Sequence, residues 1–241
     1  MDRMIYLSMA GAKASMQRQD ALAHNLANAS TPGFRAEMTA FRAVPVRGDG
    51  ASTRVYALES TPGYDAEPGA VQPTGRNLDI ALKGNAWLAV QGLDGTEAYT
   101  RGGALDVNNE GVLVTKTGLT VMGDGGPVTI PANAQVQIAP DGTISAAVGN
   151  AKPQSVGKLK LVTPEAPLQR GEDGLFRAAA GDLSADPNAR LQDGALEGSN
   201  VSAVETMIAM IAASRQFEQQ MKMVHAAQEK EQSATKLLSN S

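Results

Sequence analysis

The chain has 241 residues, a formal net charge of −4 and no cysteine. This length can bury a sizeable core without a disulfide or a metal ion. Charges of both signs are mixed along the chain without a basic block, which argues against a nucleic acid as partner. The absence of cysteine excludes a disulfide framework, a thiol nucleophile and a thiolate metal site.

No segment is typical of a cleaved signal or of a membrane span. A cleaved signal needs about 7–15 apolar residues near the start, whereas residues 1–28 interleave apolar and polar side chains. The most apolar run, residues 207–213, is far shorter than the roughly 20 residues that cross a bilayer. We therefore expect no cleaved signal peptide and no insertion into a lipid bilayer.

Helix-breaking residues divide the chain into distinct parts. All 12 prolines lie between Pro32 and Pro187, and of 25 glycines only Gly11 precedes residue 33 and none follows Gly198. Both ends can therefore be helical, and turns punctuate the middle. The pattern predicts an α+β protein with an N-terminal helix (1–34), an extended linker (35–76), a central β domain (77–198) and a C-terminal helix (199–241).

The N-terminal segment carries a narrow apolar stripe at three- and four-residue steps, typical of a coiled-coil helix about 40 Å long at 1.5 Å per residue. Its members are Ile5, Met9, Ala12, Met16, Ala23 and Leu26. The segment ends at Pro32, which disfavours helix at Thr31, and at Gly33, which permits a turn; Phe34 then supplies an apolar anchor.

The linker is harder to interpret, because glycines and prolines interrupt any period between residues 35 and 76. We expect an extended segment that is ordered only in part unless a neighbour covers it.

The central part has short apolar or alternating runs separated by turn residues. The turns are expected at residues 108–111, 123–126 and 140–142, and Trp87 is expected in the core. The domain should be all-β, antiparallel and rich in hairpins. Its predicted strands are residues 78–82, 87–91, 104–107, 112–115, 119–122, 136–139, 143–146 and 159–163.

The C-terminal segment repeats the coiled-coil pattern over a greater length, and Ser199 and Asn200 are placed to cap its first turn. We expect the two terminal helices to pair as a coiled-coil-like arm. The C-terminal helix is longer by about ten residues, which would leave part of its stripe open to other chains. The stripe comprises Ala203, Met207, Met210, Phe217, Met221, Val224 and Leu238, and is widened by Val204, Ile208 and Ile211.

No group of residues predicts catalysis, a metal ion or a cofactor. The two histidines, His24 and His225, lie on the helical segments and lack the spacing that places two ligands on one helix face. The glycine-rich residues 123–126 precede a proline and a strand, so they fit a hairpin turn better than a phosphate loop. The carboxylates of the middle lie at strand edges and turns. We therefore expect a protein that is not an enzyme.

Several stretches resemble the flagellar rod, hook and hook-associated family. They are residues 24–34 (HNLANASTPGF), residues 196–201 (LEGSNV) with the helix after them, and residues 75–82, 99–103 (YTRGG) and 111–115. The resemblance covers nearly the whole chain, and its one departure is His24, where the family usually has asparagine. The opening residues and the short length are most similar to the proximal-rod members.

The resemblance implies a structural subunit of the proximal rod, the tubular shaft that transmits torque to the distal rod and hook. The subunit would be exported by the flagellar type III apparatus and would polymerise in the periplasm with copies of itself and other rod proteins, including the distal rod protein. The helix-end turn would be Thr31, Pro32, Gly33 and Phe34. The expected assembly interface is Ile5, Met9, Met16, Asn25, Leu26, Asn28, Ile208, Ile211, Phe217 and Met221.

Three other readings stay open. A related rod position, such as the distal rod, fits the same motifs. A secreted binding module, oligomerised by its helices, predicts an exposed aromatic cluster, although aromatic residues make up only 4% of the chain. A hydrolase acting on peptidoglycan predicts a cleft with two converging carboxylates.

Overall fold

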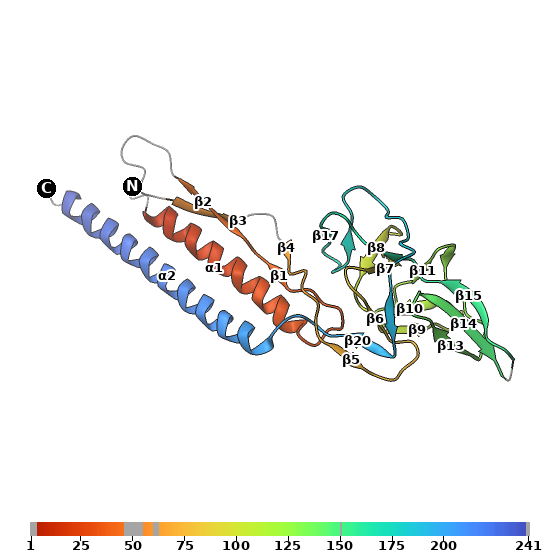
Figure 1. Cartoon of the computed structure of the whole chain (residues 1–241). Helices are drawn as coiled ribbons and strands as arrows, with labels where there is room; N and C mark the ends of the chain where they lie inside the picture. The colour runs from red at the N-terminus through yellow and green to blue at the C-terminus, as the bar shows by residue number, and fades with distance from the viewer. Residues whose placement is uncertain (1–3, 46–54, 60–62, 150, 240–241) are drawn as a thin grey trace. The chain divides into compact units, whose positions relative to one another are not determined.

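The computed structural model describes residues 4–45, 55–59, 63–149 and 151–239 (Figure 1). Two helices flank a series of antiparallel strands in the chain order, so the predicted α+β class is confirmed. The chain forms two compact units. A helical unit draws on residues 1–29, 36–65 and 201–241, and a β unit on residues 30–35 and 66–200.

The helical unit is built on two antiparallel helices, α1 (Met4–Ala27) and α2 (Ala203–Ser239), which pack side by side (Figure 1). Their buried positions carry small or short side chains, so the helix axes can approach closely. A Cβ atom on Gly11 would lie only 3.0 Å from the side chain of Gln220. The buried residues are Ser8, Ala12, Ser15, Ala21 and Asn25 on α1, and Thr206, Ala213, Val224 and Ala227 on α2.

The predicted stripe is therefore only partly the buried side of the helix pair. Ala12 and Val224 are buried as expected, but Met9, Met16 and Met207 are exposed. Periodicity alone identifies a repeating set of large apolar residues without saying whether the partner belongs to the same chain. The large side chains on these helices mostly point away from the intramolecular contact.

The first turn of α2 is capped by Ser202, not by Ser199 or Asn200. The Ser202 hydroxyl accepts a hydrogen bond from the amide of Glu205 at 3.4 Å, and its carbonyl accepts one from the Thr206 hydroxyl at 2.8 Å. The sequence offers three candidate caps within four residues, and Ser202, immediately before Ala203, is used.

The described residues of the expected linker include several short strands. In the helical unit, β2 (Phe41–Pro45) pairs antiparallel with β3 (Val55–Glu59), and β1 (Glu37–Met38) pairs with β4 (Gly63–Tyr64). Strand β3 also packs against α1. The glycines and prolines that interrupt the pattern do not prevent these pairings. Residues 46–54 and 60–62 of the expected linker lie outside the described residues.

The β unit contains a five-stranded antiparallel sheet of order β16-β7-β8-β18-β17, a three-stranded sheet of order β13-β14-β15, and several two-stranded ladders. Its strands are β5 (Val71–Pro73), β6 (Ile80–Leu82), β7 (Trp87–Gln91), β8 (Glu97–Thr100), β9 (Leu105–Val107), β10 (Leu113–Thr115), β11 (Met122–Gly123), β12 (Gly126–Pro127), β13 (Ala134–Ile138), β14 (Thr143–Val148), β15 (Gln154–Lys158), β16 (Leu161–Val162), β17 (Gln169–Arg170), β18 (Phe176–Arg177), β19 (Leu191–Asp193) and β20 (Ala195–Glu197).

All eight predicted strands overlap an observed one, and the expected antiparallel, hairpin-rich character is confirmed. Glycines with positive φ occupy the predicted turns, as at Gly111 (80°), Gly126 (111°) and Gly142 (87°). The strands that were not predicted are mostly polar or two to three residues long. Among them, β5 pairs with β20, and β19 pairs with the predicted strand β6, so distant parts of the chain meet.

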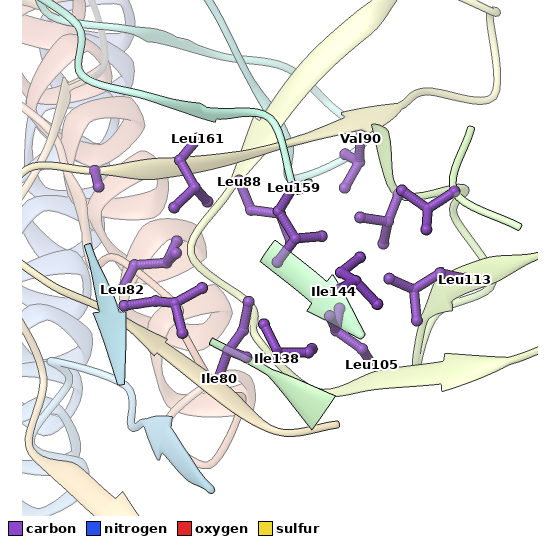
Figure 2. Packing of buried hydrophobic residues seen from close by; sticks show 14 of the residues in the cluster. Ile80, Leu82, Leu88, Val90, Leu105, Leu113, Ile138, Ile144, Leu159 and Leu161 are labelled. Atoms are coloured by element: carbon purple, nitrogen blue, oxygen red, sulfur yellow. The ribbon is translucent and has the colours of Figure 1, made fainter. Parts of the chain in front are cut away.

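The core of the β unit is formed by aliphatic side chains that converge from both sheets (Figure 2). Leu88 and Val90 of β7 pack with Ile144 of β14, and all three are fully buried. Trp87 is buried as predicted, and its ring centroid lies 4.7 Å from that of Phe176. Burial of these side chains supplies the main drive for folding of the unit.

We expect Ile144→Ala to lower the free energy of unfolding by about 2–5 kcal/mol, because it leaves a cavity in this core. Val148→Ala is the matched control, since Val148 lies on the same strand and is 50% exposed. Urea unfolding followed by the fluorescence of Trp87, the single tryptophan, measures both. Equal midpoints for the two variants would contradict the assignment of the core.

Candidate assembly surface and motif junction

The C-terminal end of α1 is fastened to β1 by the side chain of Asn25. Its amide nitrogen donates to the Glu37 carbonyl at 2.9 Å, and its amide oxygen accepts from the Glu37 backbone N–H at 2.7 Å. The buried Asn25 side chain therefore pairs with backbone as a neighbouring strand would. His24 lies beside this contact, with its Nδ1 atom 2.8 Å from a Glu37 carboxylate oxygen.

The predicted helix-end turn, Thr31 to Phe34, belongs to the β unit. Gly33 adopts φ 71°, and its N–H donates to the Glu197 carbonyl at 2.7 Å. Phe34 is buried, as expected of an anchor, and the Arg170 guanidinium lies 4.6 Å from the centroid of its ring. The turn thus joins the C-terminal stretch that precedes α2.

A buried ion triad holds this junction. Glu197 is 1% exposed, and its carboxylate lies between the guanidinium groups of Arg35 and Arg101, each 2% exposed. One carboxylate oxygen lies 2.5 Å from Arg35 Nη1, and the other accepts a hydrogen bond from Arg101 Nε at 2.9 Å and a second from Arg101 Nη2. The Gly69 N–H donates to the first oxygen at 3.1 Å.

Arg101 also donates to three backbone carbonyls: Gly84 at 2.9 Å, Ala86 at 2.6 Å and Leu82 at 2.9 Å. Burial lowers the pKa of its guanidinium, and the adjacent Glu197 carboxylate opposes that shift. This one side chain therefore fixes the turn between β6 and β7 as well as the C-terminal segment. Its place in the YTRGG motif is explained by these contacts.

Glycines of the same motifs permit close backbone approach. A Cβ atom on Gly33 would lie 2.3 Å from the Arg101 carbonyl carbon, and one on Gly69 would lie 2.1 Å from the Gly198 carbonyl oxygen. A Cβ atom on Gly103 would lie 1.7 Å from the Ile80 carbonyl oxygen. Side chains at these positions would force the segments of the junction apart.

The ten residues predicted for assembly differ in exposure. Met9 (55%), Met16 (56%), Ile208 (63%) and Ile211 (56%) are exposed, and Asn25 is buried. The remaining five, Ile5, Leu26, Asn28, Phe217 and Met221, are half-buried. Their part in assembly stays a prediction. The exposed apolar surface of α1 and α2 also includes Tyr6, Val204, Met207 and Met223.

The sequence pattern does not predict the triad. Arg101 and Glu197 stand inside motifs quoted for their resemblance, and Arg35 follows directly after Phe34. The available signal was three charged residues within otherwise apolar and glycine-rich stretches. Nothing in their spacing of 66 and 96 residues indicates that they meet.

Comparison with known proteins accounts for these motifs. Residues 5–35 match the family described as flagella basal body rod protein, residues 81–146 match the flagellar hook protein FlgE/F/G D1 domain, and residues 192–237 match the flagellar basal body rod FlgEFG protein C-terminal. The flagellar basal-body rod protein FlgF of Salmonella typhimurium is 48% identical over 252 aligned positions that cover all of both chains. This chain belongs to the FlgF family of flagellar basal-body rod proteins.

FlgF of Escherichia coli K12 is 46% identical, again over the full length of both chains. FlgG of Bacillus subtilis, a flagellar basal-body rod protein with another name, is 30% identical over 94% of this chain and 96% of its own. The matched ranges include α1 with the helix-end turn, and β20 with most of α2. All three residues of the triad lie within matched ranges of the FlgF family chain.

Two searches of the described residues were negative. None of their helices is long and apolar enough to span a bilayer. No group of three or more histidine or carboxylate side chains in the described part is arranged to hold a metal ion.

We expect Glu197→Gln to lower the free energy of unfolding of the FlgF family chain by about 3–5 kcal/mol, because it leaves two buried guanidinium groups without their counter-charge. Glu110→Gln, at an exposed turn position, is the control and should change stability little. Urea unfolding by Trp87 fluorescence reports on both. A neutral Glu197→Gln variant would show that the triad does not stabilise the β unit.

Gly103→Ala should also destabilise the β unit, since its Cβ atom would overlap the Ile80 carbonyl oxygen. The same change at Gly125, where a Cβ atom meets nothing within 4 Å and φ is not positive, should be neutral or slightly stabilising. The thermal midpoint by circular dichroism compares them. Similar midpoints would contradict the close approach at Gly103.

Proposed function

We propose that this chain is a non-enzymatic structural subunit of the flagellar rod, and that it polymerises through the exposed apolar surface of α1 and α2. The observation that carries the proposal is the distribution of that surface. Eight of the thirteen exposed large apolar side chains among the described residues lie on α1 and α2, and two more lie on β1 and β2 of the same unit, although the β unit is larger. Surface of this kind marks protein contact sites.

Assembly would bury the apolar side chains that α1 and α2 expose to solvent in the isolated subunit. Small buried residues at the contact of α1 with α2 direct the large side chains outward, where a neighbouring subunit can cover them. Burial at about 25 cal/mol per Å² would offset the cost of ordering long helices. Met9, Met16, Met207 and Met223 suit contacts with partners that are not identical, because methionine adapts its shape.

The relatives named flagellar basal-body rod protein FlgF support a finer proposal. We propose a position in the proximal rod, in the periplasmic part of the basal body, with copies of this chain and other rod proteins, including the distal rod protein, as partners. Export by the flagellar type III apparatus would need no cleaved signal peptide. In this position the subunit transmits torque toward the distal rod and hook.

The two rival functions receive less support. A glycan-binding module would expose aromatic side chains on its β unit, but Trp87, Tyr99 and Phe176 are buried there. A hydrolase would bring two carboxylates together, whereas Glu97 pairs with Lys160 at 2.7 Å and Glu197 is enclosed by two arginines. Neither carboxylate is arranged with a second one to act on a glycosidic bond.

Charged substitutions on the exposed face of α2 test the proposal. We expect the double variant Ile208→Asp/Ile211→Asp to fold but to reduce swimming in soft agar nearly to that of a strain without the chain, because carboxylates cannot be buried unpaired between subunits. Electron microscopy of basal bodies should show rods that stop short.

Gln216→Asp/Gln219→Asp is the matched control, because it adds the same charge at exposed polar positions of the same helix. The control should swim normally. Normal swimming and complete rods in the isoleucine double variant would overturn the proposal.

A further inference from the structure

The turn between β7 and β8 presents a leucine to solvent almost completely. Leu93 is 92% exposed, more than any other large apolar side chain among the described residues. A single exposed leucine is common on protein surfaces and by itself indicates nothing. The turn that carries Leu93, however, is held in place by several hydrogen bonds and ion pairs.

The turn is braced from several sides. The Gly92 N–H donates to the Thr96 carbonyl at 2.8 Å, and the Thr96 N–H and hydroxyl both donate to an Asp94 carboxylate oxygen, at 3.0 and 2.7 Å. Arg177 bridges Asp94 at 3.2 Å and Asp173 at 2.7 Å. The turn between β17 and β18 is thereby tied to the turn that carries Leu93.

Because the turn is already held in one conformation, docking of Leu93 would cost little conformational entropy. Asp94 and Asp173 together carry one negative charge more than the Arg177 that bridges them, and the exposed Glu172 precedes Asp173 in the chain. Hydrogen bonds from Thr96 lower the pKa of Asp94, and hydrogen bonds from Arg177 lower that of Asp173, so both carboxylates are charged at neutral pH. A partner for this tip should offer a hollow for one aliphatic side chain beside a positive charge.

The solvent face of the sheet β13-β14-β15 carries a shallow groove with a mixed polar and apolar lining. The β13 to β14 register pairs Gln135 with Ala147 and Gln137 with Ser145, and these residues share a shallow groove with Gly149, Ala151 and Pro153. None of the lining residues carries a carboxylate. The exposed Lys152 stands between the last two in the chain.

We propose that the Leu93 tip of one copy docks into the β13-β14-β15 groove of a second copy, with its acidic rim facing Lys152. The two surfaces lie on different sheets and differ from one another, so the contact is head-to-tail and can repeat from subunit to subunit. This contact rests on the proposed rod function and adds a β-unit interface to the helical one.

The cysteine-free chain permits a direct test. A chain with Leu93→Cys and a second with Ala147→Cys, carrying different epitope tags, are expressed together in a strain that lacks its own copy. Basal bodies are purified after mild oxidation and run on a non-reducing gel. The matched control pairs Leu93→Cys with Val148→Cys, because Val148 is the next residue of β14 and its side chain points to the other face.

We expect a disulfide-linked species with both tags, several-fold more abundant for positions 93 and 147 than for 93 and 148. Equal yields for the two pairs, or linkage mainly between two copies of residue 93, would overturn the contact. If both chains are present in basal bodies without any linked species, the contact is overturned and the rod function stands. If neither chain enters basal bodies, both proposals fail.

Discussion

Three charged side chains, Arg35, Glu197 and Arg101, hold together segments from the beginning, the end and the middle of the β unit. Their net charge is positive and all three are buried. Replacement of such a group by apolar residues is often neutral or stabilising, so its presence is weak support for stability as such. The triad does fix the positions of chain segments. Glu197 can neutralise both arginines only when the segment that follows α1 and the segment that precedes α2 lie beside each other.

The two units differ in where their large apolar side chains lie. In the β unit, aliphatic side chains from two sheets fill a dry interior, and its aromatic residues are buried among them. In the helical unit, most of the fully buried side chains of α1 and α2 are small, and several large apolar ones, such as Met9, Ile208 and Ile211, are exposed. The core of the β unit is thus complete in one copy, whereas the helix pair leaves large apolar side chains exposed, and this is the surface that we propose other chains cover.

Much of this organisation could be predicted from local pattern. The helix breakers set the two helices apart from the strands, and glycines at positive φ, such as Gly111 and Gly142, marked hairpin turns correctly. Features that depend on distant pairing could not be predicted. Strand β5 is recognisable only with its partner β20, the amide of Asn25 acts only on the backbone of Glu37, and the triad needs residues 35, 101 and 197 together. The apolar stripes were recognised, but periodicity could not tell which large side chains face the partner helix and which face solvent.

The pairing of β19 with β6 and of β20 with β5 also determines when the β unit can fold. Its last strands are supplied by residues 191–197, close to the start of α2. A chain that emerges from a ribosome with its N-terminus first lacks the partner strands of β5 and β6, and the counter-charge of Arg35 and Arg101, until this segment follows. Such long-range closure is slow, and it keeps the chain from reaching its final form early. The segment that completes the β unit is thus also the last part of that unit to be synthesised.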